Sequence, residues 1–185
     1  DANTTASNNT AVGTSSLSAN TTGTENVAVG QAALAANTTG GLNTAVGRLA
    51  LLVNTTGQYN TAVGNACLDA NTTANANSAL GYSALSANTT GSQNAAVGYA
   101  TMQNNTTGNH NSGFGSLALQ YNTTGGNNTA VGDDALRQNT TAANNSAVGR
   151  AALTANTTGH DNTSVGANAL QSNTTADFNS AFGQA

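Results

Sequence analysis

The triplet Asn-Thr-Thr recurs every 17 residues along the whole chain, without one insertion or deletion. It begins at Asn3, Asn20, Asn37, Asn54, Asn71, Asn88, Asn105, Asn122, Asn139, Asn156 and Asn173. A fixed period of this length indicates a repeat architecture in which each unit stacks on its neighbours. With the first Asn as position 1, the unit reads N-T-T-G-x-x-N-T-A-V-G-x-x-A-L-x-x. Residues 1–185 are therefore expected to form a single uninterrupted array with no linker and no evident caps.

The repeat predicts short strands rather than helices. Position 11 is Gly in all eleven units and position 4 is Gly in seven, so most units leave no helical stretch beyond about nine residues uninterrupted. Between these points lie runs of Thr, Val, Asn and Leu, which suit strands separated by turns. We expect an all-β fold, a parallel β-solenoid of eleven 17-residue coils. Disorder is the alternative for a chain rich in Asn, Thr and Gly, but disorder gives no reason to keep large apolar residues at fixed positions.

In such a solenoid each residue lies above its own copy in the next coil, about 4.8 Å away. The Asn residues of positions 1 and 7 are invariant, and their side-chain amides can hydrogen-bond from coil to coil. The predicted structural Asn ladders comprise Asn20, Asn26, Asn37, Asn43, Asn54, Asn60, Asn88, Asn94, Asn122 and Asn128. Position 10 is Val, Leu or Phe, and position 15 is Leu or Met, so both are expected to be apolar core columns. These columns include Val29, Leu34, Val46, Leu51, Val63, Leu68, Val97, Met102, Val131 and Leu136.

Two apolar pairs stand next to each other in every unit, Ala-Val at positions 9 and 10 and Ala-Leu at positions 14 and 15. Neighbours in a strand face opposite sides, so if Val fills the interior then Ala faces outward, or the reverse. An outward apolar column could contact another chain. The alternative is a bend at the Gly of position 11 that turns both residues inward.

Composition excludes several functions. The net charge is −4, with three Arg and no Lys, which leaves no basic stripe for nucleic acid. The apolar runs are far shorter than the roughly 20 residues of a membrane span. The two His fall at positions 6 and 5 of units three apart, and the seven acidic residues are scattered over the unit without recurring carboxylate pairs. The single Cys67 replaces a small residue at position 14. We therefore expect no catalytic, cofactor or metal site, two surface histidines and an inert thiol.

The segment A-V-G-x-x-A-L, as in residues 45–51 and 147–153, resembles two repeat families. One is the head repeat of YadA-like trimeric autotransporter adhesins, which forms a left-handed parallel β-roll. The other is the N-T-A-V-G-x-x-A-L-x-x-N-T-T-G array of phage tail-fibre and bacterial fibre proteins, and this similarity extends over essentially the whole chain. The resemblance implies a left-handed solenoid, self-association as a homotrimer or filament, and a structural rather than catalytic role.

The sequence thus predicts a non-enzymatic extracellular structural fibre or filament segment, exposed on a cell surface or a virion. Its expected partner is the chain itself, joined laterally or head to tail. An ice-binding solenoid is the first alternative, and a head that binds surface glycans is the second. The candidate surface Thr ladder for ice lies at position 2, in Thr21, Thr38, Thr55, Thr72, Thr89, Thr106, Thr123, Thr140, Thr157 and Thr174.

Overall fold

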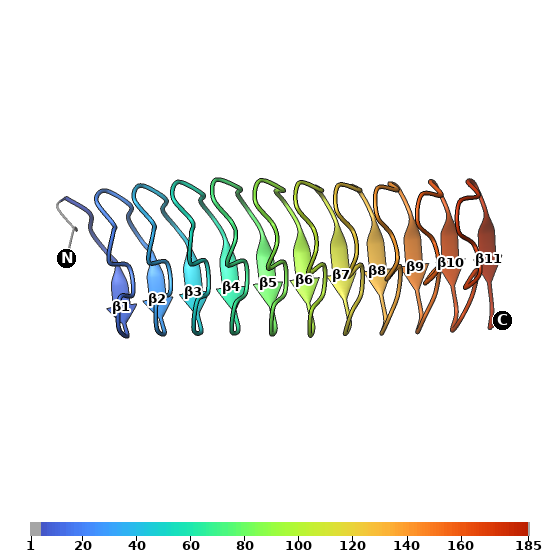
Figure 1. The fold of residues 1–185 in the computed structure, drawn as a ribbon, viewed down its shortest axis with the longest axis horizontal. Helices are drawn as coiled ribbons and strands as arrows, with labels where there is room; N and C mark the ends of the chain where they lie inside the picture. The colour runs from blue at the N-terminus through green and yellow to red at the C-terminus, as the bar shows by residue number, and fades with distance from the viewer. Residues whose placement is uncertain (1–4, 185) are drawn as a thin grey trace.

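A computed structural model describes residues 5–184, and these residues form one elongated stack of coils with the two termini at opposite ends (Figure 1). Each coil contributes one three-residue strand, made of positions 8, 9 and 10 of the unit. The strands are β1 (Thr10–Val12), β2 (Val27–Val29), β3 (Thr44–Val46), β4 (Thr61–Val63), β5 (Ser78–Leu80), β6 (Ala95–Val97), β7 (Ser112–Phe114), β8 (Thr129–Val131), β9 (Ser146–Val148), β10 (Thr163–Val165) and β11 (Ser180–Phe182). The described part of the chain contains no helix.

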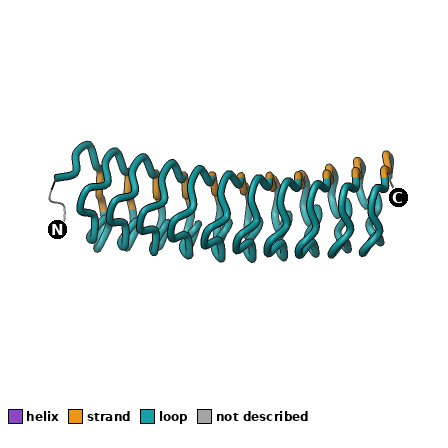
Figure 2. Tube along the Cα trace, turned by 90° about the horizontal axis from the view of Figure 1, so that it is seen from above, coloured by secondary structure: helices purple, strands orange, loops and turns teal. Residues whose placement is uncertain are grey.

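All eleven strands belong to one parallel sheet in sequence order, from β1 to β11. Each residue pairs with the residue 17 positions further on; Thr44 pairs with Thr61, for example. The sheet forms one side of the stack, and turns and loops form the rest of each coil (Figure 2). The parallel β-solenoid predicted from the period is confirmed. The hand of the coil, which rested on resemblance, stays a prediction.

Each coil closes through four residues with positive φ. The Gly of position 11 ends the strand with φ between 120° and 141°, a region that side chains rarely enter. A Cβ on Gly98 would lie 2.5 Å from the carbonyl oxygen of Gly115 in the next coil, so this position also needs Gly for space. Positions 6, 13 and 15 adopt left-handed conformations although they carry other residues, such as Gln93, Ala100 and Met102.

The interior is built from six positions, which are 1, 4, 7, 9, 14 and 15. Position 15 supplies the largest buried side chains, and its predicted core column is confirmed. The fully buried members are Leu34, Leu51, Leu68, Leu85, Met102, Leu119, Leu136 and Leu153. Ala columns at positions 9 and 14 fill the space beside them, so only small side chains fit between the strand and the Leu column.

The predicted core column at position 10 is wrong. Its side chains lie on the outer surface of the sheet, and the Ala of position 9 points inward instead. The residues that were predicted to be in the core but lie on this outer surface are Val29, Val46, Val63, Val97 and Val131. The physical reason is the alternation of a strand: Leu at position 15 already fills the coil, so the small residue faces it and the larger one faces out.

Units 6 and 7 show how closely the inner columns fit. Thr101 replaces the usual Ala of position 14, and Gly113 replaces the usual Ala of position 9 in the next unit. A Cβ on Gly113 would lie 2.8 Å from the Thr101 methyl group and 3.0 Å from the Met102 methyl group. The larger residue in one column is thus matched by a smaller one in the other, as close packing requires.

Candidate functional site

The two Asn ladders confirm the predicted columns and differ in their bonding. At position 1, each side-chain Nδ2 donates to Oδ1 of the Asn in the preceding coil, over 2.8 Å from Asn54 to Asn37. The same Nδ2 donates to the carbonyl oxygen of position 4 in its own coil, such as Gly57 at 3.1 Å. These Asn side chains are buried from Asn20 to Asn156. The ladder therefore continues through the interior with every coil as both donor and acceptor.

At position 7 the Asn side chain caps backbone groups. Oδ1 of Asn43 accepts a hydrogen bond of 3.0 Å from the backbone N–H of Asn60. Nδ2 of Asn43 donates to the carbonyl oxygen of Gly57, in the next coil, over 2.9 Å. The side chain thus satisfies a buried backbone N–H that would otherwise have no partner, and it gives the Gly57 carbonyl a second donor beside Asn54.

Burial also decides the status of the Asn-Thr-Thr sequons, which match the acceptor pattern for N-glycosylation. The Nδ2 atom that would carry the sugar is used twice in hydrogen bonds and has no access to solvent at Asn20 through Asn156. Glycan attachment at these sites is incompatible with the folded coil.

The candidate surface Thr ladder at position 2 is wrong in its choice of column. These threonines are half-buried from Thr21 to Thr157, and their hydroxyl groups are used inside the solenoid. Oγ1 of Thr55 donates to the carbonyl oxygen of Thr72 over 3.1 Å, and the same bond recurs from coil to coil. The threonine column that is exposed in every coil is that of position 3, from Thr22 to Thr175.

The titratable residues do not converge. Within residues 5–184, no group of three or more His, Cys, Asp or Glu side chains could hold a metal ion. His110 is exposed, whereas His160 is half-buried and its Nδ1 accepts a 2.9 Å hydrogen bond from the Ala143 backbone N–H. Burial raises the pKa of the Cys67 thiol to about 12, so this thiol is protonated and a poor nucleophile at neutral pH.

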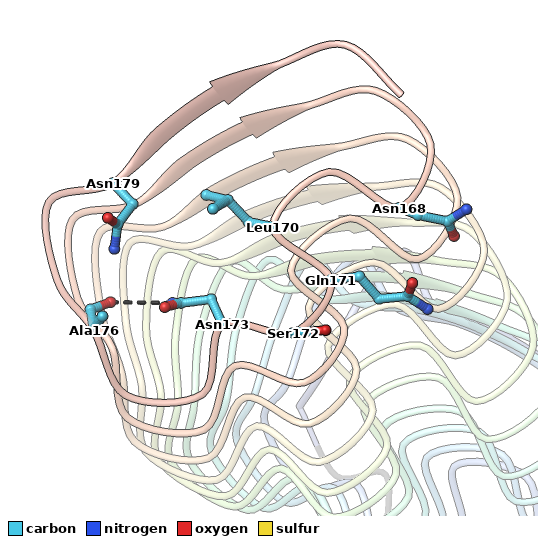
Figure 3. Close-up of a pocket in the computed structure, with 7 residues that line it drawn as sticks. All are labelled: Asn168, Leu170, Gln171, Ser172, Asn173, Ala176 and Asn179. Atoms are coloured by element: carbon cyan, nitrogen blue, oxygen red, sulfur yellow. Dashed lines mark hydrogen bonds between the residues drawn. The ribbon is translucent and has the colours of Figure 1, made fainter. Parts of the chain in front are cut away.

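One hollow lies at the C-terminal end of the stack (Figure 3). Four of the residues around it belong to the interior positions 15, 1, 4 and 7, and the other three belong to the adjoining turn at positions 13, 16 and 17. The seven residues are Asn168, Leu170, Gln171, Ser172, Asn173, Ala176 and Asn179. In the preceding coils this space is filled by the next coil, so the hollow is the open end of the core and its lining shows no cluster of catalytic groups.

The most distinctive surface is the outer face of the sheet, which we define as the first and third residues of strands β1 to β11. The first residue is Thr or Ser in nine strands, and the third is Val, Leu or Phe in all of them. No charged residue occurs in either column. The third residue is markedly exposed in several coils, reaching 49% at Leu80, 43% at Phe114 and 75% at Phe182.

Exposed aromatic residues lie close to this face. Tyr82 and Tyr99 follow β5 and β6 at position 12, are 54% and 58% exposed, and stack on each other with ring centroids 5.5 Å apart. A continuous, uncharged surface with large exposed apolar groups is typical of an interaction site.

Comparison of the chain with protein-family models, with curated proteins and with solved structures finds no match in any of the three. The function must therefore be inferred from the repeat and its surfaces. The part of the chain that the structure describes also holds no helix long and apolar enough to cross a membrane.

Proposed function

We propose that this chain is a non-enzymatic structural segment of an extracellular fibre or filament, which supplies length and stiffness. One observation carries the proposal: both Asn ladders and the parallel sheet run without a break from coil to coil. Eleven strands at about 4.8 Å make a rod roughly 50 Å long. Bending such a rod would lengthen hydrogen bonds in the sheet and in both buried ladders together.

The composition of the surface supports the same role. The varied positions 5, 6, 12 and 13 carry unrelated residues from coil to coil, whereas the buried positions hardly change. Selection on this pattern preserves the stack and not a particular arrangement of surface groups. The resemblance of the repeat to fibre and adhesin arrays points in the same direction.

Immunogold electron microscopy of the intact source particles tests this role. Antibodies against the exposed loops should label thin projections on the outside of the cell or virion. Label confined to the cell interior, or labelled particles without projections, would overturn the extracellular fibre. Small-angle scattering of the purified chain supplies the physical control, because a stiff rod and a flexible chain of this mass give different scattering profiles.

Ice binding is a second candidate, favoured by the exposed Thr column of position 3 rather than by the column predicted from sequence. The ten threonines from Thr22 to Thr175 are exposed in every described coil and repeat at the coil spacing. Ice binding would show as thermal hysteresis with faceted crystals, reduced by Thr90→Lys and Thr107→Lys together. Absence of hysteresis at millimolar concentration would exclude it. A glycan-binding head stays a prediction without a structural observation of its own.

A further inference from the structure

The two columns of the outer face vary together within single coils. Three strands have a third residue bulkier than Val, namely Leu80, Phe114 and Phe182. Each of these strands begins with Ser, at Ser78, Ser112 and Ser180. Conversely, all five strands that begin with Thr end in Val: β1, β3, β4, β8 and β10. The bulkiest third residues therefore go with a small first residue, and β2, with Val at both ends, is the one strand with two larger residues.

Packing within one copy does not require this match. Two residues apart in a strand, Ser112 and Phe114 are separated by about 6.6 Å along the chain direction, whereas neighbouring strands are about 4.8 Å apart. The nearest outer-face neighbours of Phe114 are accordingly its register partners, Val97 and Val131. Neither is reduced in size to make room for the phenyl ring. The register neighbours within one copy therefore give no reason for the match.

A second copy placed face to face explains the match. A two-fold rotation about an axis parallel to the stack lays each coil on the same coil of the other copy and reverses the direction of the strand. The third residue of each strand then meets the first residue of the equivalent strand. Phe and Leu meet Ser, and Val meets Thr, Ser or Ala in every coil except that of β2, where Val29 meets Val27. The gap between the two sheets therefore stays nearly even.

We propose that the outer face binds a second copy of this chain, with the two stacks parallel and in register. The inference deepens the proposed structural role, on which its biological purpose rests. It makes the laterally paired rod the building unit of the fibre.

The charges at the edges of the face agree with this arrangement. In the parallel pair, position 12 of one copy lies opposite position 6 of the same coil in the other. Charges occur at these positions only in Glu25, Arg48, Asp133, Arg150 and Asp161 among the described coils. Each meets an uncharged residue, respectively Gln31, Leu42, Asn127, Asn144 and Ala167. No like charges are brought together.

The opposite orientation is disfavoured by the same residues. A two-fold axis along the strands, centred on β6, makes the stacks antiparallel and lays position 12 on position 12. Arg48 then faces Arg150. Leu80 faces Phe114 and Val12 faces Phe182, in a gap that at the remaining coils separates two Val residues. Like charge and excess volume both oppose this pairing.

The area is sufficient for a specific pair. Eleven strands span roughly 50 Å, and three residues span about 10 Å, so each copy contributes about 500 Å². The two copies together bury about 1,000 Å², before the flanking loops are counted, which reaches the lower limit for a biological interface.

Analytical ultracentrifugation of the whole chain tests the pair. The expected species has twice the 18.0 kDa mass of one chain. Val131→Arg, in the third-residue column of the outer face, should abolish the dimer, whereas Thr124→Arg, in the exposed position 3 column, should leave it intact. A chain that stays monomeric at every concentration, a trimer, or a dimer insensitive to Val131→Arg would overturn the inference. A stiff monomer would leave the structural role standing.

A matched pair of smaller changes tests the register. Ser112→Thr adds a methyl group opposite Phe114 of the other copy and should raise the dimer dissociation constant about tenfold or more. Ser146→Thr adds the same methyl group opposite Val148, a pairing already present in five coils, and should leave the constant unchanged. Equal effects of the two changes would refute the in-register arrangement. The melting temperature of each variant as a monomer separates loss of pairing from loss of folding.

Orientation is tested by crosslinking in a Cys67→Ala background. A chain with Gln31→Cys mixed with a chain with Glu25→Cys should form an intermolecular disulfide, because these positions face each other only in the parallel pair. Absence of the crosslink in a population shown to be dimeric would contradict the proposed orientation.

Discussion

Removal of one Asn side chain from the position 1 ladder should be among the most damaging single changes in this protein. Asn105 donates from Nδ2 to Oδ1 of Asn88 over 2.8 Å and to the carbonyl oxygen of Gly108 over 3.0 Å. Its own Oδ1 accepts a 2.8 Å hydrogen bond from Asn122. The Gly108 carbonyl keeps a second donor, Asn94 Nδ2. Asn105→Ala therefore leaves two buried groups without partners, Asn88 Oδ1 and one N–H of Asn122.

Each buried polar group left without a partner costs about 1–3 kcal/mol. We predict that Asn105→Ala lowers the free energy of unfolding by about 2–6 kcal/mol. The position 7 ladder provides an internal comparison. Asn94→Ala leaves one group without a partner, the backbone N–H of Asn111. The other two groups stay bonded, because Asn77 Oδ1 still accepts from the backbone N–H of residue 94 and the Gly108 carbonyl still accepts from Asn105 Nδ2. The expected cost of Asn94→Ala is about 1–3 kcal/mol, roughly half as much.

Urea unfolding monitored by circular dichroism measures these differences, with Thr107→Ala as the exposed control. Coils contact only their neighbours, so hydrogen exchange should also show the loss of protection centred on units 6 to 8. Costs that are equal for the two Asn variants, or a cost for Asn105→Ala as small as for Thr107→Ala, would show that the ladder bonds do not carry the stability assigned to them.

Three further changes probe the coil. Gly98→Ala should cost about 3 kcal/mol or more, since it combines a positive φ of 139° with a backbone clash, whereas Gly126→Ala, with no such φ, should cost about 1 kcal/mol or less in the same unfolding assay. Ala76→Gly should raise the melting temperature, because Ala76 has a φ of 58°, while Ala87→Gly, at ordinary φ, should lower it. Burial raises the pKa of Asp69, whose Oδ1 has no hydrogen-bond partner, so the folded state loses stability as pH rises from the unfolded value of 3.8 through the raised folded value. Asp69→Asn should therefore stabilise the chain at pH 7 by about 1 kcal/mol or less, a low figure because this side chain is only half-buried, and the gain should vanish at pH 3.

The invariant positions could be predicted from the sequence because stacking places each residue on its own copy. A buried Asn is satisfied by another Asn in the same column, so identity at positions 1 and 7 indicated both burial and bonding. The same reasoning located the Leu column, where Met102 is the one replacement and preserves the volume.

Side-chain size alone could not predict which face of the strand points into the coil. Val is larger than Ala, which favoured Val as the core residue, but the interior beside Leu at position 15 accepts mainly small side chains such as Ala, Gly and Ser. A signal was present in the sequence. Phe114 replaces Val with no reduction in Val97 or Val131, whereas Gly113 is reduced where Thr101 is enlarged. Variation that neighbouring coils do not compensate marks an outer column, and variation that they compensate marks an inner one.

The backbone conformations at positions 6, 13 and 15 gave no such signal. Left-handed φ is usually recognised by Gly or Asn, yet these positions carry residues as different as His110, Leu117 and Leu119. The strain of each is held by the coils on either side, whose hydrogen bonds fix the path of the backbone. A property that depends on neighbouring coils cannot be read from the residue type at one position.

The two Asn ladders also give the stack a direction. At both positions the donor belongs to the later coil and the Oδ1 acceptor to the earlier coil, as in the bonds from Asn105 to Asn88 and from Asn111 to Asn94. A rod built this way has chemically different ends. In the proposed parallel pair both copies point the same way, so the polarity is kept, whereas an antiparallel pair would cancel it. A fibre that attaches at one end and acts at the other needs that polarity, and here it follows from the same buried amides that hold the coils together.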